Sequence, residues 1–240
     1  MGTMTDKNRF LIVNADDFGQ SPGVNQGIIK AFEKGIVTST SLMVRFPTAG
    51  EAAIYAKEHP DLSVGLHFNI GEWVYRDYNW EPLYEVVPVN NSIGLARELA
   101  RQLDGFQQLM GRPPTHIDSH QHVHKEEPLR SVAIAAAQTL NIPLRHYCPI
   151  TYRGEFYGQS AEGYPCHEYI GVNGLVDILS SLPHGVTELG CHPGEDEGLD
   201  TMYRDERSIE LETLCDPGIR STIERESIVL CSFHEYILNR

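Results

Sequence analysis

The feature that most limits the fold of this chain is a regular alternation of short apolar runs with segments of helical character. Seven apolar, β-branched runs predict strands at residues 10–15, 36–44, 62–66, 115–118, 142–147, 186–191 and 227–231. Helices are predicted at residues 22–34, 49–59, 92–110, 126–140, 175–182 and 206–214. Such alternation favours parallel strands joined by right-handed crossovers, so we expect an α/β fold, a nearly closed (β/α) barrel of about seven strands. An open doubly wound sheet is the alternative, although the sequence lacks its Gly-x-Gly-x-x-Gly fingerprint.

The composition indicates one globular domain with an acidic charge balance. The chain has 240 residues, 41% of them hydrophobic, and its 19 Lys and Arg against 33 Asp and Glu give a net charge of −14. That balance argues against nucleic acid and anionic membrane as partners, because both attract basic surfaces. We expect a single domain over residues 10–240, after a disordered or tag-derived segment over residues 1–9. No signal-peptide pattern or transmembrane-length apolar run is present, which predicts a cytoplasmic location.

Acids and histidines recur where the predicted strands end. Asp16 and Asp17 follow the first strand, His67 follows the third and His192 follows the sixth. The fourth strand leads into the segment 116–124, in which four of the eleven histidines are spaced at short intervals. In a parallel α/β architecture, ligands bind at the carboxyl ends of the strands. These residues are therefore the candidates for a functional site.

The residue types match the needs of a hydrolytic metal centre. One Asp and two His can hold a divalent ion while leaving positions open for water, a second carboxylate can take a proton from that water, and a further His can protonate a leaving group. These five roles could be filled by Asp16, Asp17, His67, His120 and His192. Each residue also has a structural interpretation, such as a helix cap for the aspartates or a hydrogen-bonded turn residue for His192.

The remaining histidines are interpreted differently. His116, His120, His122 and His124 are too many to reach one site together, so we expect at most two or three of them to be functional. Structural or surface roles are expected for the others, which are His59, His146, His167, His184 and His234.

Five segments of the sequence resemble the YdjC-like carbohydrate deacetylase family. They are Leu11–Gly19, Gly35–Thr40, Gly65–His67, Pro114–His124 and Cys191–Gly194, and they span most of the chain. The resemblance implies an irregular seven-stranded (β/α) barrel, TIM-barrel-like, of the polysaccharide deacetylase type. It also implies an enzyme that removes acetyl groups from N-acetylated sugars with the help of a divalent metal ion.

The resemblance also assigns roles to individual residues. Metal ligation falls to Asp17, His67 and His120, the general base to Asp16 and the general acid to His192. His120 is chosen because it follows the Asp-Ser pair of the family motif. Gln121 stands where many relatives have a further His, and we do not expect this position to be a ligand. The segment 69–91 matches less well, so substrate choice is the least defined part of the resemblance.

The expected ligand is a small N-acetylated oligosaccharide such as chitobiose, as in chitin degradation, and a homodimer is usual in the family. Two imidazoles favour Zn²⁺ or another transition ion, whereas Mg²⁺, with which the family is commonly associated, prefers oxygen ligands. Two other functions stay open. A metal-dependent phosphoesterase would need an anion site and often a second metal ion. A non-catalytic sugar- or metal-binding protein would have no use for an acid and a base.

Overall fold

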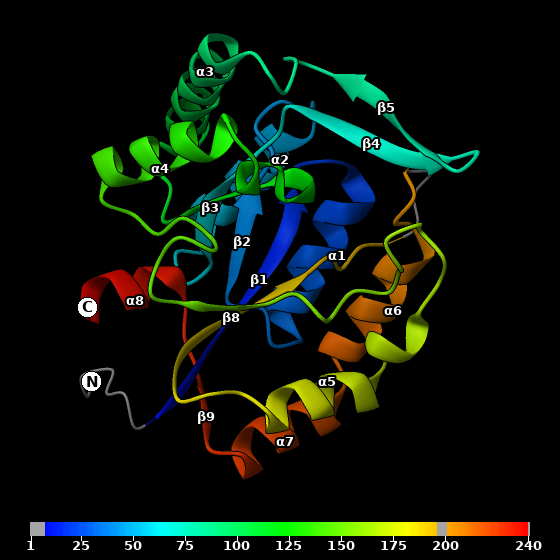
Figure 1. Cartoon of the computed structure of the whole chain (residues 1–240). Coiled ribbons are helices and arrows are strands. Elements are labelled where there is room, and N and C mark those ends of the chain that lie inside the picture. Colours follow the sequence, from blue (N-terminus) through cyan, green and yellow to red (C-terminus); the bar gives the residue numbers. More distant parts are fainter. Residues whose placement is uncertain (1–7, 196–200, 240) are drawn as a thin grey trace.

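A mainly parallel sheet, curled into a half-barrel, forms the centre of the molecule (Figure 1). The computed structural model describes residues 8–195 and 201–239. The strands of this sheet are β1 (Arg9–Phe18), β2 (Ser39–Leu42), β3 (Ser63–Phe68), β6 (Ile117–Ser119), β7 (Thr151–Arg153), β8 (Gly185–Cys191) and β9 (Ile228–Leu230). Their order is β6-β3-β2-β1-β8-β7, and every pair is parallel. β9 pairs with the first residues of β1. β2 pairs with the later part of β1, from Asn14 onward.

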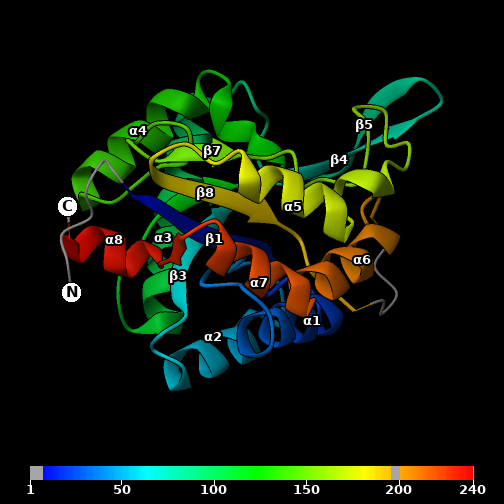
Figure 2. The same ribbon diagram turned by 90° about the horizontal axis from the view of Figure 1, so that it is seen from below.

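Helices cover the outside of the curled sheet (Figures 1 and 2). They are α1 (Pro22–Glu33), α2 (Ala49–Glu58), α3 (Ser92–Met110), α4 (Leu129–Leu140), α5 (Val172–Ser180), α6 (Asp205–Leu214), α7 (Pro217–Arg225) and α8 (Phe233–Asn239). Two short 3₁₀ segments are η1 (His120–Lys125) and η2 (His167–Tyr169). The predicted start of α1 is confirmed, because the Ser21 side chain accepts a hydrogen bond from the Val24 amide and Pro22 occupies the first turn.

The core lies between the sheet and the helices, and β1 runs through its centre. Every residue of β1 after Arg9 is buried. A strand covered on both faces carries a continuous apolar run, which is why the sequence shows no alternation there. Because β1 is central, the two aspartates at its end are placed in the middle of the sheet edge.

The prediction of a strand at residues 142–147 is wrong. This segment forms an isolated bridge between Leu144 and Ile117, with the Arg145 amide donating to the Ile117 carbonyl at 3.0 Å. The extended run stops there because His146 has a φ of 68°, which turns the chain. The strand next to β8 is β7, in a stretch that the sequence left unassigned.

The segment 69–91 contains an antiparallel hairpin that the sequence did not specify. Its strands are β4 (Gly71–Arg76) and β5 (Asn79–Glu85), joined by Asp77 and Tyr78, both with positive φ. Figure 1 shows this hairpin projecting away from the main sheet. The segment 69–91 is therefore a defined element, and it carries residues of the cavity described below.

Smaller differences concern helix ends. The start of α3 is capped by Asn91, because its side chain accepts a hydrogen bond from the Gly94 amide at 2.9 Å. The helices α7 and α8 were missed, although Asp216 followed by Pro217 is a helix-start signal. β1 begins one residue before the predicted domain boundary, and residues 1–7 of the expected N-terminal segment lie outside the described residues. None of the described helices has the length and apolar character needed to cross a membrane.

Candidate active site

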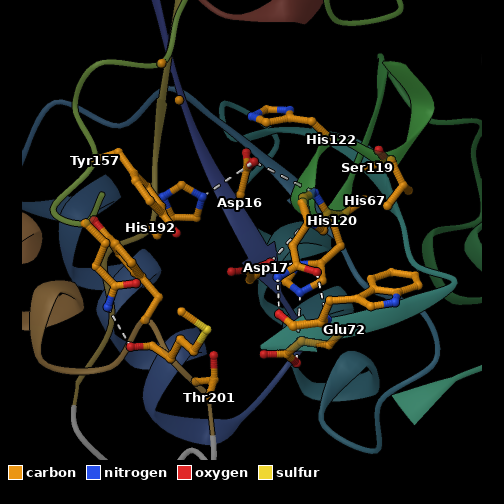
Figure 3. A pocket seen from close by; sticks show the side chains of 18 of the residues that line it. Asp16, Asp17, His67, Glu72, Ser119, His120, His122, Tyr157, His192 and Thr201 are labelled. Atoms are coloured by element: carbon orange, nitrogen blue, oxygen red, sulfur yellow. Dashed lines mark hydrogen bonds and ion pairs between the residues drawn. The ribbon is translucent and has the colours of Figure 1, made fainter. Parts of the chain in front are cut away.

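Four strands of the half-barrel end at one cavity of about 730 Å³. The five predicted site residues all line it: Asp16 and Asp17 from the end of β1, His67 from β3, His120 after β6 and His192 after β8 (Figure 3). Parallel strands deliver these side chains to the same edge of the sheet. The part of the cavity formed by Asp16, Asp17, His67 and His120 is called the floor below.

Three floor residues form a cluster able to hold a metal ion. Oδ1 of Asp17 lies 3.1 Å from Nε2 of His67 and 3.0 Å from Nδ1 of His120. One ligand atom from each residue can be chosen so that all three lie within 4.8 Å of one another, and all three residues are buried. Within the described part of the chain, His67 Nε2 and His120 Nε2 make no hydrogen bond of good geometry, although His67 Nε2 lies close to Asp17 Oδ1. Buried nitrogens of this kind are costly unless a ligand satisfies them.

Asp118, which the sequence analysis did not select, orients His67. Its Oδ1 lies 2.7 Å from Nδ1 of His67, so that Nε2 points to Asp17. Burial alone would lower the pKa of His67, but the carboxylates of Asp118, Asp17 and Asp16 raise it to about 10. The acids around His67 thus favour a positive charge at this position. A carboxylate behind a histidine is the usual support of a metal-ligating imidazole.

The adjacent residues Asp16 and Asp17 point in different directions, and each has its own arginine. Asp17 has a φ of 70°, and the pairing of β1 with β2 shifts register at this point. Asp17 Oδ2 accepts from Arg207 at 2.7 Å. Asp16 accepts from two nitrogens of Arg145, at 2.6 and 2.8 Å. The left-handed backbone at Asp17 explains how two neighbours can serve different parts of one site.

Both carboxylates are held ionised. Burial alone would raise the pKa of Asp16, but the Arg145 guanidinium more than offsets this and lowers it. For Asp17 the opposing effect comes from Arg207 and His120, which lower its pKa well below the usual range. No motif or spacing marks Arg145 as the partner of Asp16, because the two residues lie 129 positions apart in the chain.

His192 occupies the side of the cavity opposite the histidines of the floor. Its Nε2 lies 3.9 Å from Asp16 Oδ2, and in Figure 3 Asp16 is joined by dashed lines to both His192 and His67. Behind it, Nδ1 lies 3.7 Å from Oε1 of Glu210. Burial would lower the pKa of His192, but its interactions with Glu210 outweigh burial and raise it. His192 is therefore suited to carry a proton near neutral pH.

The turn after β8 fixes the position of His192. The Gly194 amide donates to the Arg207 carbonyl at 3.1 Å. A Cβ atom added to Gly27 in α1 would lie 2.4 Å from the Gly194 Cα, so the helix and the turn pack with their backbones in direct contact. Glycine at both positions permits this close approach.

The other histidines of the segment 116–124 have separate places. His122 lines the cavity, whereas His116 is buried and stacks on Phe233 with ring centroids 3.7 Å apart. His124 is buried, and its Nε2 lies 3.1 Å from the Arg145 carbonyl. A further carboxylate, Glu72 of β4, lies 3.9 Å from His120 Nε2; the sequence analysis missed it because it belongs to the hairpin.

Comparison with known proteins places the chain among carbohydrate deacetylases. The model of the family described as YdjC-like protein matches residues 10–225. A Geobacillus stearothermophilus protein named carbohydrate deacetylase is 32% identical over 95% of this chain and 98% of its own length. A Serratia marcescens protein named chitooligosaccharide deacetylase is 31% identical over 95% of this chain and 99% of its own length. These matches confirm the resemblance and the prediction of an enzyme of the carbohydrate deacetylase class.

Solved structures confirm the type of fold. A crystal structure from Enterococcus faecalis V583, of a protein provisionally named for cellobiose-phosphate cleavage, has a TM-score of 0.77 at 27% identity, covering 95% of this chain and 99% of that chain. A family 4 carbohydrate esterase from Streptomyces lividans has a TM-score of 0.56 at 13% identity, covering 94% and 92% of the two chains. At such identity the second structure shows a shared fold alone.

Proposed function

The chain belongs to the YdjC-like family, and we propose that it is a metal-dependent hydrolase that removes acetyl groups from N-acetylated sugars such as chitooligosaccharides. The observation that carries this proposal is the arrangement of the cavity, in which an ionised Asp16 lies beside a metal-binding cluster and 3.9 Å from His192, a histidine whose pKa Glu210 raises. The cytoplasmic location and the homodimer expected from the sequence are part of the same proposal.

Asp17, His67 and His120 are the proposed metal ligands. One carboxylate and two imidazoles, buried together, form a donor set that suits Zn²⁺, and Mg²⁺ is the second candidate. The buried Nε2 atoms of the two histidines, which make no well-aligned hydrogen bond with the described residues, fit a bound ion. A divalent ion held there supplies a Lewis acid, which polarises an amide carbonyl and makes water more acidic.

Asp16 is the proposed general base, which takes the proton of the attacking water. Arg145 donates a hydrogen bond to each of its two oxygens, so the carboxylate is fixed in orientation and stays ionised. The same pairing makes Asp16 a weak base, and its contribution therefore depends on its position beside the cluster, 4.0 Å from His67 Nδ1. Arg145 acts as a positioning residue in this proposal.

His192 is the proposed general acid. The amine of an amide leaves readily only when it is protonated, so deacetylation needs a proton donor at the nitrogen side of the scissile bond. Glu210 favours the imidazolium form of His192, and His192 Nε2 lies 3.9 Å from Asp16 Oδ2, beside the proposed base. Amide hydrolysis requires both a base for the water and an acid for the leaving amine, and the cavity offers one of each.

The alternatives are less well supported by the geometry. A phosphoesterase needs cationic groups free to receive phosphate. Among the described residues that line the cavity, Arg207 is the only Lys or Arg, and it is bonded to Asp17 and Gln20. A protein that merely binds sugar or metal would not need a carboxylate such as Glu210 to raise the pKa of a histidine beside Asp16.

The proposal is tested by acetate release together with metal analysis. We expect the purified protein to hold one divalent ion per chain and to release acetate from N,N′-diacetylchitobiose. A chelator should abolish the release, and added Zn²⁺ or Mg²⁺ should restore it. Acetate release that survives complete removal of metal would contradict metal dependence. Hydrolysis of sugar phosphates without acetate release would favour the phosphoesterase.

A further inference from the structure

The hairpin β4–β5 carries two tryptophans that line the cavity. Trp73 is partly buried, whereas Trp80 is 49% exposed. The Trp80 ring packs on Tyr75, its partner across the hairpin, with ring centroids 5.6 Å apart. A large aromatic ring left half-exposed at the opening of a cavity is a surface that a ligand can cover with a gain in free energy.

Aromatic rings also line the other side of the cavity. Tyr157 is 37% exposed and stacks on Tyr203, with ring centroids 4.4 Å apart and an interplanar angle of 12°. Figure 3 places Tyr157 beside His192, across the cavity from Glu72, the residue that precedes Trp73. Trp80 and Tyr157 together are called the rim below. The cavity thus has an ionic floor and an aromatic rim.

Two glutamine side chains fasten the hairpin to the rest of the molecule. The side-chain amide of Gln121 accepts from the Trp73 amide at 2.9 Å and donates to the Trp73 carbonyl at 2.7 Å. At the base of the hairpin, Gln102 of α3 makes the same pair of bonds to the Asn69 backbone, at 3.1 and 2.6 Å. Because these bonds fix the hairpin before a ligand arrives, little entropy is lost when Trp80 is used for binding.

We propose that Trp80 stacks on the sugar ring next to the one that loses its acetyl group, so that the enzyme selects substrates of two or more rings. This inference rests on the proposed function, which puts the reacting acetamide at the buried floor. A ring linked to that sugar must then extend toward the opening, where Trp80 stands half-exposed. The C–H groups on one face of a pyranose ring are apolar and match the flat indole surface.

The experiment compares a disaccharide with a monosaccharide. kcat/KM is measured for N,N′-diacetylchitobiose and for N-acetylglucosamine, in the wild type and in Trp80→Ala. We expect the disaccharide to be preferred by the wild type, and the ratio of the two kcat/KM values to fall about tenfold in the variant, through KM. Trp80→Phe, which keeps an aromatic face, should retain most of the preference. Tyr78→Ala is the matched control, because Tyr78 is an exposed aromatic of the same hairpin that does not line the cavity.

The outcomes separate this inference from the proposed function. If the wild type releases acetate and Trp80→Ala leaves the ratio unchanged, the inference is wrong while the function stands. A change of oligomeric state in Trp80→Ala at an unchanged ratio would likewise overturn it, since Trp80 would then contact a second copy. If no acetate is released from either sugar, the proposed function fails. Calorimetric titration of both sugars then decides the inference, which requires that Trp80→Ala weaken disaccharide binding alone.

Discussion

The floor and the rim of the cavity differ in what holds them in place. At the floor, Asp16 and Asp17 are each paired with a buried arginine that comes from a distant part of the chain. At the rim, Trp80 and Tyr157 present half-exposed rings from the hairpin and from the segment after β7. Charges fixed in a buried site interact strongly and cost little reorganisation during a reaction, whereas exposed rings offer contact area. Substitutions at the floor should therefore affect metal binding and turnover, and substitutions at the rim should affect substrate affinity.

The largest effect is expected from the three proposed ligands. Replacing Asp17, His67 or His120 by Ala should weaken metal affinity by at least about 100-fold, since loss of an outer supporting group alone costs about 10- to 100-fold. Acetate release should be lost with the metal. Metal content per chain is measured by elemental analysis after dialysis, with circular dichroism as the check on folding. Full metal content in all three folded variants would show that the ion, if any, binds elsewhere.

A smaller loss, confined to turnover, is expected for Asp16→Asn. The variant should keep its metal, because Asp16 is not among the proposed ligands, and should lose about 10²- to 10⁴-fold in kcat, the usual range for a missing general base. The fold should survive because Arg145 still has Asp118 and Glu188, at 2.9 and 2.6 Å. Asp17→Asn is the matched comparison, and it should lose metal. If Asp16→Asn loses the ion as readily, the two neighbours share one role.

The smallest effect among the ionic groups of the cavity is expected from Glu210, which supports His192, and it concerns pH. Glu210 raises the pKa of His192, so the protonated acid persists to higher pH and the rate falls only when the pH rises through that pKa. Glu210→Gln removes the charge, lowers the pKa of His192 and should move the alkaline limb of the kcat/KM profile down by about one pH unit. Glu206→Gln, a buried carboxylate on the same helix, is the control and should leave the limb in place. An alkaline limb that does not move in Glu210→Gln would argue against His192 as the acid.

At the rim, the change expected from Trp80→Ala is a loss of preference for the longer substrate, about tenfold, with the metal retained. A large loss of metal or of kcat in that variant would mean that floor and rim are not separate in function. The contrast between Asp16→Asn and Trp80→Ala, one acting on kcat and the other on KM, is therefore the direct test of the division.

The parts of the site that could be predicted are those set by local sequence. Asp16 and Asp17 follow a continuous apolar run, and His67 and His192 lie at or just after other predicted strands. Parallel strands bring their ends to one edge whatever the details of packing, so five candidate residues could be expected together. The prediction of a strand at 142–147 failed because a positive φ at His146 ends the extended run. The residue type alone does not indicate this backbone conformation.

The supporting residues were decided only by the tertiary structure. Arg145, Asp118 and Glu210 act on Asp16, His67 and His192, and each pair lies on different elements, so no spacing along the chain marks it. The rim depends in the same way on Gln121 and Gln102, whose amides fasten the hairpin from η1 and α3. Periodicity and motif spacing report which residues leave a strand at its end, because that is a local property of the backbone. Which buried charge faces which partner depends on the register of distant elements, and only the folded chain fixes it.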